Sequence, residues 1–324
     1  MSHSEENKPE ATEQQDGNNV VDQFFSAQGT TIPSDFKSGF VAIVGRPNVG
    51  KSTLMNHILG QKLSITSRKP QTTRHKVTGV YTLADTQYLF VDTPGFQKLY
   101  VNKFNTALNQ SVVNSLTNVD AIIYVVEAGS FNAGDEAVLN LLPADANVML
   151  VVNKRDKLKI SLELDRFIAE VSSKYPFKYV LSVSAKHDQG LDLLLDAARE
   201  CLPESVFLYP EDQLTDKSSK FMASEIIREK LFRSLGEELP YNLMVEIDSF
   251  EEKPKLTRVF ATIIVDRDNQ KPMVIGKGGE KLKKISTESR LDMEKMFGTK
   301  VHLEVWVKVK GGFADELKFL QQFE

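Results

Sequence analysis

The segment GRPNVGKS at residues 45–52 constrains the fold more than any other feature of the chain. It fits the pattern G-x-x-x-x-G-K-[ST], in which a glycine-rich loop wraps its backbone N–H groups around phosphates. The segment follows an apolar run, GFVAIVG, which is typical of a buried parallel strand, and it precedes a helical stretch that ends at Gly60. The sequence therefore predicts a strand–loop–helix unit that binds a nucleotide, with Lys51 on the β- and γ-phosphates and the Ser52 hydroxyl on Mg²⁺.

Further apolar runs and helical patterns alternate after this loop. The predicted strands are HKVTGVYTL, QYLFVD, AIIYVVE, NVMLVVNK and KYVLSVSA, and the predicted helices lie near 103–116, 134–142, 160–173 and 190–201. This alternation favours an α/β domain, with a mixed, mostly parallel sheet and helices on both faces. No full helix separates the first two of these strands, so an antiparallel pair is expected at one edge.

Composition divides the chain into five parts. Residues 1–37 contain seven acidic residues against two lysines and few apolar ones, so they are predicted to be a disordered acidic extension. The α/β domain occupies 38–202, and residues 203–219, which contain two prolines, are predicted to be a linker. A small α+β domain follows at 220–315, and residues 316–324 form a tail. The chain has no apolar run of membrane-spanning length and a single cysteine, Cys201, so a cytoplasmic soluble protein is expected.

Three short motifs follow the first loop in an order that indicates a guanine nucleotide. In DTPG (92–95), Asp92 is placed to hold Mg²⁺ through water, and Gly95 to offer a backbone N–H to a γ-phosphate. In NKRD (153–156), Asp156 can accept hydrogen bonds from guanine N1–H and N2, which adenine lacks. In SAK (184–186), the N–H of Ala185 can meet guanine O6. Each motif ends a predicted strand, where open α/β sheets bind ligands.

The stretch SRKPQTTRHK at 67–76 is the candidate sensor of the γ-phosphate, because a threonine on a polar loop can bind Mg²⁺ and order the loop. Thr72 and Thr73 both qualify, and Thr73 is favoured. The predicted metal ligands are therefore Ser52, Thr73 and Asp92. The predicted nucleotide site comprises Gly45, Arg46, Pro47, Asn48, Val49, Gly50, Lys51, Ser52, Asp92, Thr93, Pro94, Gly95, Phe96, Asn153, Lys154, Arg155, Asp156, Ser184, Ala185 and Lys186.

A second glycine loop, VIGKGG, lies in the C-terminal domain. It lacks Lys-Ser/Thr after its final glycine, so it has no Mg²⁺ ligand for a nucleotide. Gly-Lys-Gly-Gly at 276–279 instead fits the G-x-x-G that joins two helices in KH modules and clamps about four nucleotides of single-stranded RNA. The surrounding order of helix, strand, strand, helix–loop–helix and strand matches a type II KH domain. The predicted RNA-binding residues are Ile275, Gly276, Lys277, Gly278, Gly279, Lys281 and Lys284.

The set GRPNVGKS, TT, DTPG, NKRD and SAK resembles the translation-factor class of GTPases. Such a domain followed by VIGKGG resembles the Era family, the bacterial GTPases of small ribosomal subunit assembly. The segments RFIAEVSSKYPF, FMASEIIREKL, ELPYNLMVEI, KPMVIGKGGEKLKKI and VHLEVWVKVK extend the resemblance over about 38–315, whereas the acidic extension departs from it. The resemblance implies a GTP-hydrolysing switch that binds the 3′ end of small-subunit ribosomal RNA and assists small-subunit assembly. A monomer is expected, and a peripheral inner-membrane association is left open.

The residues expected to act in hydrolysis are Lys51, Thr73, Gly95 and Asn48. Asn48 resembles the residue that helps bind potassium in some GTPases of this class, so K⁺ is a candidate cofactor beside Mg²⁺. Phe96 stands where Ras-type GTPases place a water-orienting glutamine, which predicts slow intrinsic hydrolysis. Two alternatives remain at this point: a P-loop ATPase tethered to RNA, and an RNA-binding protein that senses GTP without hydrolysing it.

Overall fold

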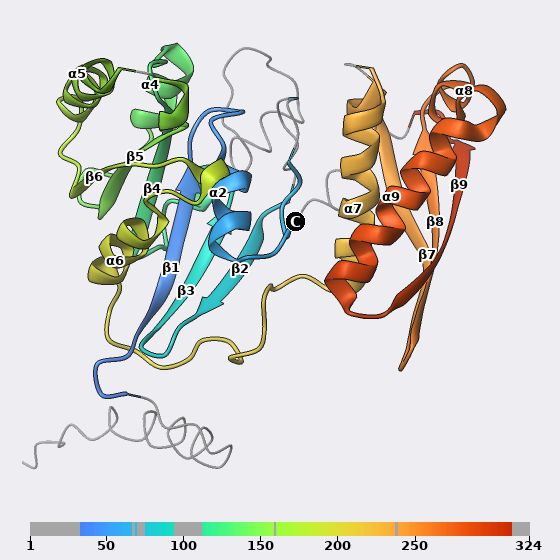
Figure 1. Ribbon diagram of the computed structural model, residues 1–324, viewed down its shortest axis with the longest axis horizontal. Helices are drawn as coiled ribbons and strands as arrows, with labels where there is room; N and C mark the ends of the chain where they lie inside the picture. Colours follow the sequence, from blue (N-terminus) through green and yellow to red (C-terminus); the bar gives the residue numbers. More distant parts are fainter. Residues whose placement is uncertain are drawn as a thin grey trace, which may run out of the picture.

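The computed structural model describes residues 33–66, 69, 75–93, 112–158, 160–236 and 239–312, which form two domains (Figure 1). The first contains a six-stranded sheet in the order β2-β3-β1-β4-β5-β6. Its strands are β1 (Lys37–Val44), β2 (Val77–Thr82), β3 (Thr86–Asp92), β4 (Ala121–Glu127), β5 (Val148–Asn153) and β6 (Tyr179–Ser182). Among these six described strands, β2 and β3 pair antiparallel and the other neighbours pair parallel. The mixed, mostly parallel sheet is confirmed, together with its antiparallel edge pair.

Helices cover both faces of this sheet. One buried cluster joins alternate strand residues to α2 (Lys51–Ile58) and α6 (Leu191–Cys201), and a second joins the intervening residues to α4 (Ala133–Leu139) and α5 (Ser161–Ser172). Because both faces are covered, the central strands are apolar along nearly their whole length. The carboxyl ends of the parallel strands therefore meet at one edge, and the polar residues that follow them are brought together there.

The second domain has a three-stranded sheet in the order β7-β8-β9. Its elements are α7 (Ser219–Ser234), β7 (Leu243–Lys253), β8 (Leu256–Val265), α8 (Gln270–Ile275), α9 (Glu280–Phe297) and β9 (Lys300–Val309). β7 and β8 pair antiparallel, whereas β8 and β9 are parallel because the α8–α9 crossover connects them. The order of elements is the predicted type II KH layout, with α7 and α9 packed together on the sheet. Short 3₁₀ turns occur at Arg155–Lys157, Ala185–His187, Leu239–Asn242 and Lys277–Gly279.

The segment predicted as a linker is bound to the first domain over much of its length. Leu214 accepts a hydrogen bond from the backbone of Val80 (2.9 Å), and Asp216 accepts one from Thr78 (2.9 Å), so the segment runs along the outer edge of β2. The side chain of Gln87 also accepts hydrogen bonds from the backbone of 208 and 209. An edge strand carries unpaired backbone groups, and this segment satisfies several of them.

The N-terminal boundary differs slightly from the sequence-based one. β1 begins at Lys37, and Phe36 is buried against Phe207 with ring centroids 4.4 Å apart. Phe36 and Lys37 thus belong to the folded domain, because Phe36 packs on Phe207 of the linker segment and Lys37 pairs in the sheet, whereas residues 33–35 are exposed. The rest of that extension, the tail at 316–324 and most of the helix expected at 103–116 lie outside the described residues. Within the described ranges, no helix is long and apolar enough to cross a membrane.

Candidate nucleotide and RNA sites

The loop after β1 has a backbone that requires glycine at two positions. Gly45 has a φ of +155°, and a Cβ there would lie 2.4 Å from the carbonyl oxygen of Val125. Gly50 has a φ of +106°, and a Cβ there would lie 2.3 Å from Nδ2 of Asn153. Any side chain at either position would displace neighbouring groups, so the glycines of the motif are needed for the loop to close above the sheet.

Lys51 opens α2 and points into the loop. Its side chain is buried, and its ammonium donates hydrogen bonds to the carbonyl oxygens of Gly45 (3.0 Å) and Arg46 (3.1 Å). Burial lowers the pKa of Lys51 to about 8, and the nearby Asp92 carboxylate opposes that shift. The ammonium is therefore held where the phosphates of a nucleotide are expected, but its charge is poorly solvated.

We expect nucleotide affinity to fall above pH 8. Phosphates bind the charged form of Lys51, and above this pH the nucleotide-free protein increasingly loses that charge. Linkage makes the loss approach about tenfold per pH unit above the pKa of the free protein. Titrations with GDP from pH 6.5 to 9 measure this, and calorimetry in buffers of different ionisation enthalpy should detect proton uptake on binding. A Lys51→Met variant should bind weakly and without this pH dependence, and a flat profile in the native protein would contradict the expectation.

Ser52 and Asp92 form the candidate metal site. The Ser52 hydroxyl donates to Oδ2 of Asp92 at 2.9 Å, although the two residues come from α2 and from the end of β3. Mg²⁺ prefers hard oxygen ligands, so this pair fits the ion. The neighbouring Thr93 is buried and donates to the carbonyl oxygen of Ile43 (2.8 Å), which makes it an anchor of the strand end. The other residues predicted for this region, Thr73, Pro94, Gly95 and Phe96, lie outside the described residues.

Asn153 joins three of the predicted motifs. Its Nδ2 donates to the carbonyl oxygen of Val49 (2.9 Å), and its Oδ1 accepts from the backbone N–H groups of Lys154 (2.7 Å) and Ala185 (3.1 Å). The side chain thus binds the phosphate loop, NKRD and SAK at one point. The N–H of Ala185, which was predicted to meet guanine O6, donates its hydrogen bond to Asn153 in this structure. The side chain of Val49 belongs to the apolar core of the domain.

Asp156 lies beside Ser184, whose hydroxyl donates to Oδ1 of Asp156 at 2.5 Å. That hydrogen bond lowers the pKa of Asp156, so its carboxylate is ionised at neutral pH. Arg155 points elsewhere, toward the side chain of Gln189 and the carbonyl oxygen of Ser182, and so ties the loop to β6. Lys186 is exposed. The hydrogen bond from Ser184 holds the carboxylate in one position, as the predicted recognition of a guanine edge would require.

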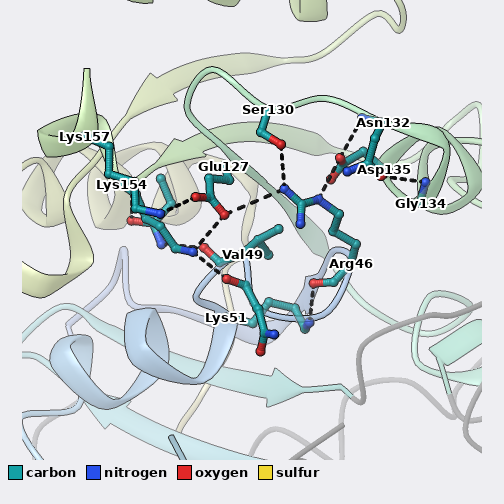
Figure 2. A network of polar contacts seen from close by, with 12 residues as sticks. Arg46, Val49, Lys51, Glu127, Ser130, Asn132, Gly134, Asp135, Lys154 and Lys157 are labelled. Atoms are coloured by element: carbon teal, nitrogen blue, oxygen red, sulfur yellow. Dashed lines mark hydrogen bonds and ion pairs between the residues drawn. The ribbon is translucent and has the colours of Figure 1, made fainter. Parts of the chain in front are cut away.

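Arg46 does not point its guanidinium toward the phosphate position. Figure 2 shows it directed away from the loop toward α4, where Nε donates to Asp135 at 2.8 Å and a terminal nitrogen to Ser130 at 3.1 Å. Any contact of Arg46 with a nucleotide is therefore expected through its backbone. Sequence reasoning missed these partners and Glu127. The position of Glu127 could have indicated it as a site residue, because it ends the apolar run of β4 at the same sheet edge as the other motifs.

The second glycine loop connects α8 to α9. Gly276 has a φ of +76°, and a Cβ there would lie 2.7 Å from Cβ of Lys281, whereas a Cβ at Gly278 would meet nothing within 4 Å. The surface of the loop is therefore open to a ligand backbone. Ile275 is half-buried against the domain core, and Lys281 donates to the carbonyl oxygen of Met273 (3.0 Å). The predicted contacts Lys277, Gly279 and Lys284 also lie on this loop or the first turns of α9, with both lysines exposed.

The two domains contact each other through ion pairs. Lys62, which follows α2, lies 2.5 Å from Glu229 on α7 and 2.9 Å from Asp292 on α9. Arg233 on α7 donates to both the carbonyl oxygen (3.2 Å) and the hydroxyl (3.0 Å) of Thr66. The carboxylate of Glu229 is almost fully buried, so its pairing with Lys62 is shielded from solvent.

Lys69, in the predicted sensor loop, also reaches the second domain. Its ammonium donates to the carbonyl oxygens of Phe232 (2.8 Å), Leu235 (2.5 Å) and Gly236 (3.1 Å) at the C-terminal end of α7. Carbonyl groups at a helix C-terminus lack partners within the helix and carry partial negative charge, so a cation is stabilising there. The predicted sensor loop is thereby joined at Lys69 to α7, the first helix of the second domain.

Comparisons with known proteins agree with this architecture. Residues 40–154 match a family described as 50S ribosome-binding GTPase, and residues 238–312 match the KH domain. GTPase Era from Chromobacterium violaceum is 59% identical over 288 residues, which cover 89% of this chain and 97% of that protein. GTPase Era from Neisseria meningitidis is 55% identical over 296 residues, covering 91% and 96%.

Two solved structures of Era resemble the chain closely, each with a TM-score of 0.84 and 35% identity. One is a tyrosine-to-alanine variant from Aquifex aeolicus bound to GDP and AlF₄⁻, and the match covers 89% of this chain and 99% of that one. The other is Era in complex with Mg²⁺, GDPNP and nucleotides 1506–1542 of 16S ribosomal RNA, with 89% and 98% covered.

The fold and the sites define a P-loop GTPase joined to a KH domain, and the enzyme activity of this class is hydrolysis of GTP to GDP and phosphate. The alternative of a P-loop ATPase is thereby set aside. The chain belongs to the Era family of GTPases.

Proposed function

We propose that this GTPase is a molecular switch that binds small-subunit ribosomal RNA through its KH domain and assists assembly of the small ribosomal subunit. The proposal of a switch rests on the contact of Lys69 with the C-terminal carbonyl groups of α7. A change in the sensor loop with the γ-phosphate would alter this contact, and α7 is a helix of the RNA-binding domain. GTP binding and RNA binding then share one structural element.

The RNA ligand is proposed from two lines of support. The glycine loop at 276–279 is open and carries exposed lysines, which suits a phosphate backbone. A relative that matches nearly the whole chain was solved with a fragment of 16S ribosomal RNA, which favours the 3′ region of small-subunit RNA as the ligand here. The GTPase family that residues 40–154 match is named for binding to the 50S subunit, but this match does not include the KH domain.

Mg²⁺ would be held by Ser52 and Asp92 and would neutralise charge on the β- and γ-phosphates. We propose K⁺ as a further cofactor near Asn48, whose φ of +67° places its backbone in the left-handed region at the tip of the loop. Equal turnover in sodium and potassium buffers would contradict the role of K⁺. We further propose that the protein acts as a cytoplasmic monomer.

The direct test of the proposed function is release of phosphate from GTP, with and without small ribosomal subunits. We expect slow release alone and faster release with small subunits, while large subunits serve as the control. No release under either condition would favour the alternative of a GTP sensor that does not turn over. Equal stimulation by large and small subunits would contradict the proposed partner.

The switch itself predicts that RNA affinity depends on the bound nucleotide. With a non-hydrolysable GTP analogue in place of GDP, affinity for the RNA fragment should rise by at least about fivefold, the lower end of typical coupling between sites. Affinities must be compared at one salt concentration, because phosphate contacts are salt-dependent. A Lys69→Met variant should bind both ligands but lose the difference between the two nucleotides. Equal affinities in the native protein would mean that the domains are only tethered.

A further inference from the structure

Glu127 lies at the centre of a group of charges between the phosphate loop and the guanine loop (Figure 2). It is the last residue of β4, and its side chain is 15% exposed. Its Oε1 lies 2.5 Å from the ammonium of Lys157, its Oε2 lies 2.9 Å from that of Lys154, and a terminal nitrogen of Arg46 lies 3.7 Å away. One carboxylate thus contacts three cations from two loops that are about a hundred residues apart in the sequence.

Lys154 is the cation in this group with the most direct connection to a nucleotide. Its ammonium also donates to the carbonyl oxygen of Asn48 at 2.6 Å, so the side chain spans from the guanine loop to the tip of the phosphate loop. The backbone of Lys154 is in the left-handed region, with a φ of +63°. Glu127 and Asn48 together fix the end of the side chain. The aliphatic part in between offers an apolar surface that can lie over the base of a bound nucleotide.

Arg46 connects the same carboxylate to α4. Its guanidinium is held by Asp135, which is fully buried, and the Asp135 side chain also caps α4 by accepting from the backbone of Asn132 (3.0 Å). The carbonyl oxygen of Arg46 accepts from Lys51. The start of the phosphate loop is therefore anchored to a capped helix, and Glu127 lies between this anchor and the guanine loop.

The charge of Glu127 has a consequence when a nucleotide binds. Phosphates would attract the ammonium of Lys154, which lies beside the phosphate loop, and a longer reach toward them would draw its aliphatic part away from the base position. Although burial opposes it, the hydrogen bonds from Lys154 and Lys157 lower the pKa of Glu127, so the carboxylate remains ionised at neutral pH and competes for the ammonium.

We propose that Glu127 is a positioning residue for guanine-nucleotide binding, which acts by holding Lys154 between β4 and the phosphate loop. Its action is indirect, through the ammonium of Lys154 rather than through a contact with the nucleotide. It sets where the end of the Lys154 side chain lies, and thereby the spacing of the phosphate loop and the guanine loop that this side chain spans. The inference rests on the nucleotide site described above and is independent of RNA binding.

The test is a Glu127→Gln variant, which keeps the size of the side chain and removes its charge. We expect about tenfold weaker binding of both GDP and GTP, equivalent to about 1.4 kcal/mol, and mainly faster release. The matched control is Glu136→Gln, which removes an exposed carboxylate from α4 near the same loop and should leave affinity unchanged. RNA affinity measured without nucleotide should be unchanged in both variants. The positioning role of Glu127 can therefore be refuted without refuting the proposed RNA binding, and the reverse.

A double-mutant cycle separates positioning from a general structural role. In a Lys154→Met background, Glu127→Gln should cause less than about a twofold further loss, because the interaction through which it acts is already absent. A structural role would instead give the same loss in both backgrounds, together with a lower melting temperature. Glu127→Asp keeps the charge with a shorter reach and should bind with intermediate affinity. Native affinity in both the Gln and the Asp variants, or additive losses in the cycle, would overturn the proposal.

Discussion

Replacing Asp156 by Asn is expected to weaken GTP binding by about 10²- to 10⁴-fold, because two hydrogen bonds to a charged acceptor are lost at about 1.5–3 kcal/mol each. The same variant should accept xanthosine triphosphate, since xanthine presents a carbonyl group where guanine has its amino group. The hydroxyl of Ser184 that now donates to the Asp156 carboxylate can donate equally to the amide oxygen of Asn, so the loop should keep its shape.

Competition between GTP and xanthosine triphosphate for the variant measures the effect directly. Asp188→Asn is the matched control, because this acid lies in the loop after SAK but is exposed and paired with His57. The control should bind GTP with no more than a small change. If Asp156→Asn retained the full preference for GTP over xanthosine triphosphate, the assignment of NKRD as the guanine-reading motif would be wrong.

Replacing Gly278 by Asp is expected to abolish most RNA binding, with a loss of at least about a hundredfold. A carboxylate at the loop would repel the phosphate backbone, and its side chain would occupy the surface that the backbone approaches. The φ of Gly278 is +59° and a Cβ there would meet nothing within 4 Å. Asp tolerates this backbone region better than most residues, so the domain should remain folded.

Gly298→Asp provides a control of the same chemistry at the other end of the same helix. Gly298 follows α9 with a φ of +67°, and a Cβ there also meets nothing within 4 Å. Both variants add one negative charge and the same backbone strain, so only the one at the loop should affect RNA affinity, while both should bind GTP normally. Equal RNA losses in the two variants would indicate a general charge effect and remove the loop as the contact surface.

Local sequence was enough to predict most elements of the fold. The motif at 45–52 requires a strand before it and a helix after it, and β1 and α2 lie there. The unbroken apolar runs of β4 and β5 indicated strands covered on both faces, and the missing helix between β2 and β3 indicated their antiparallel pairing. The pattern around 276–279 likewise predicted two helices joined by an open loop. In each case the residues that determine the structure are neighbours in the chain.

Contacts that depend on tertiary structure were not predictable in this way. Arg46 has its partner on α4 rather than at the phosphates. The sequence identifies Glu127 only as an acidic residue at a strand end, and its contacts with Lys154 and Lys157 arise because β4 pairs with β5. The linker segment pairs with β2 because that strand is an edge, which its own sequence does not reveal.

The sequence alone thus determined the two domains, the guanine motifs and the open glycine loop, since these arise from short-range patterns of glycine, apolar and charged residues. Only the tertiary structure decided how these parts are joined. Lys62 meets Glu229, and Lys69 meets the end of α7, across more than 160 residues of chain. Such pairings are selected by the packing of whole elements against one another, because side-chain charges attract any opposite partner and only the fold decides which one lies within reach.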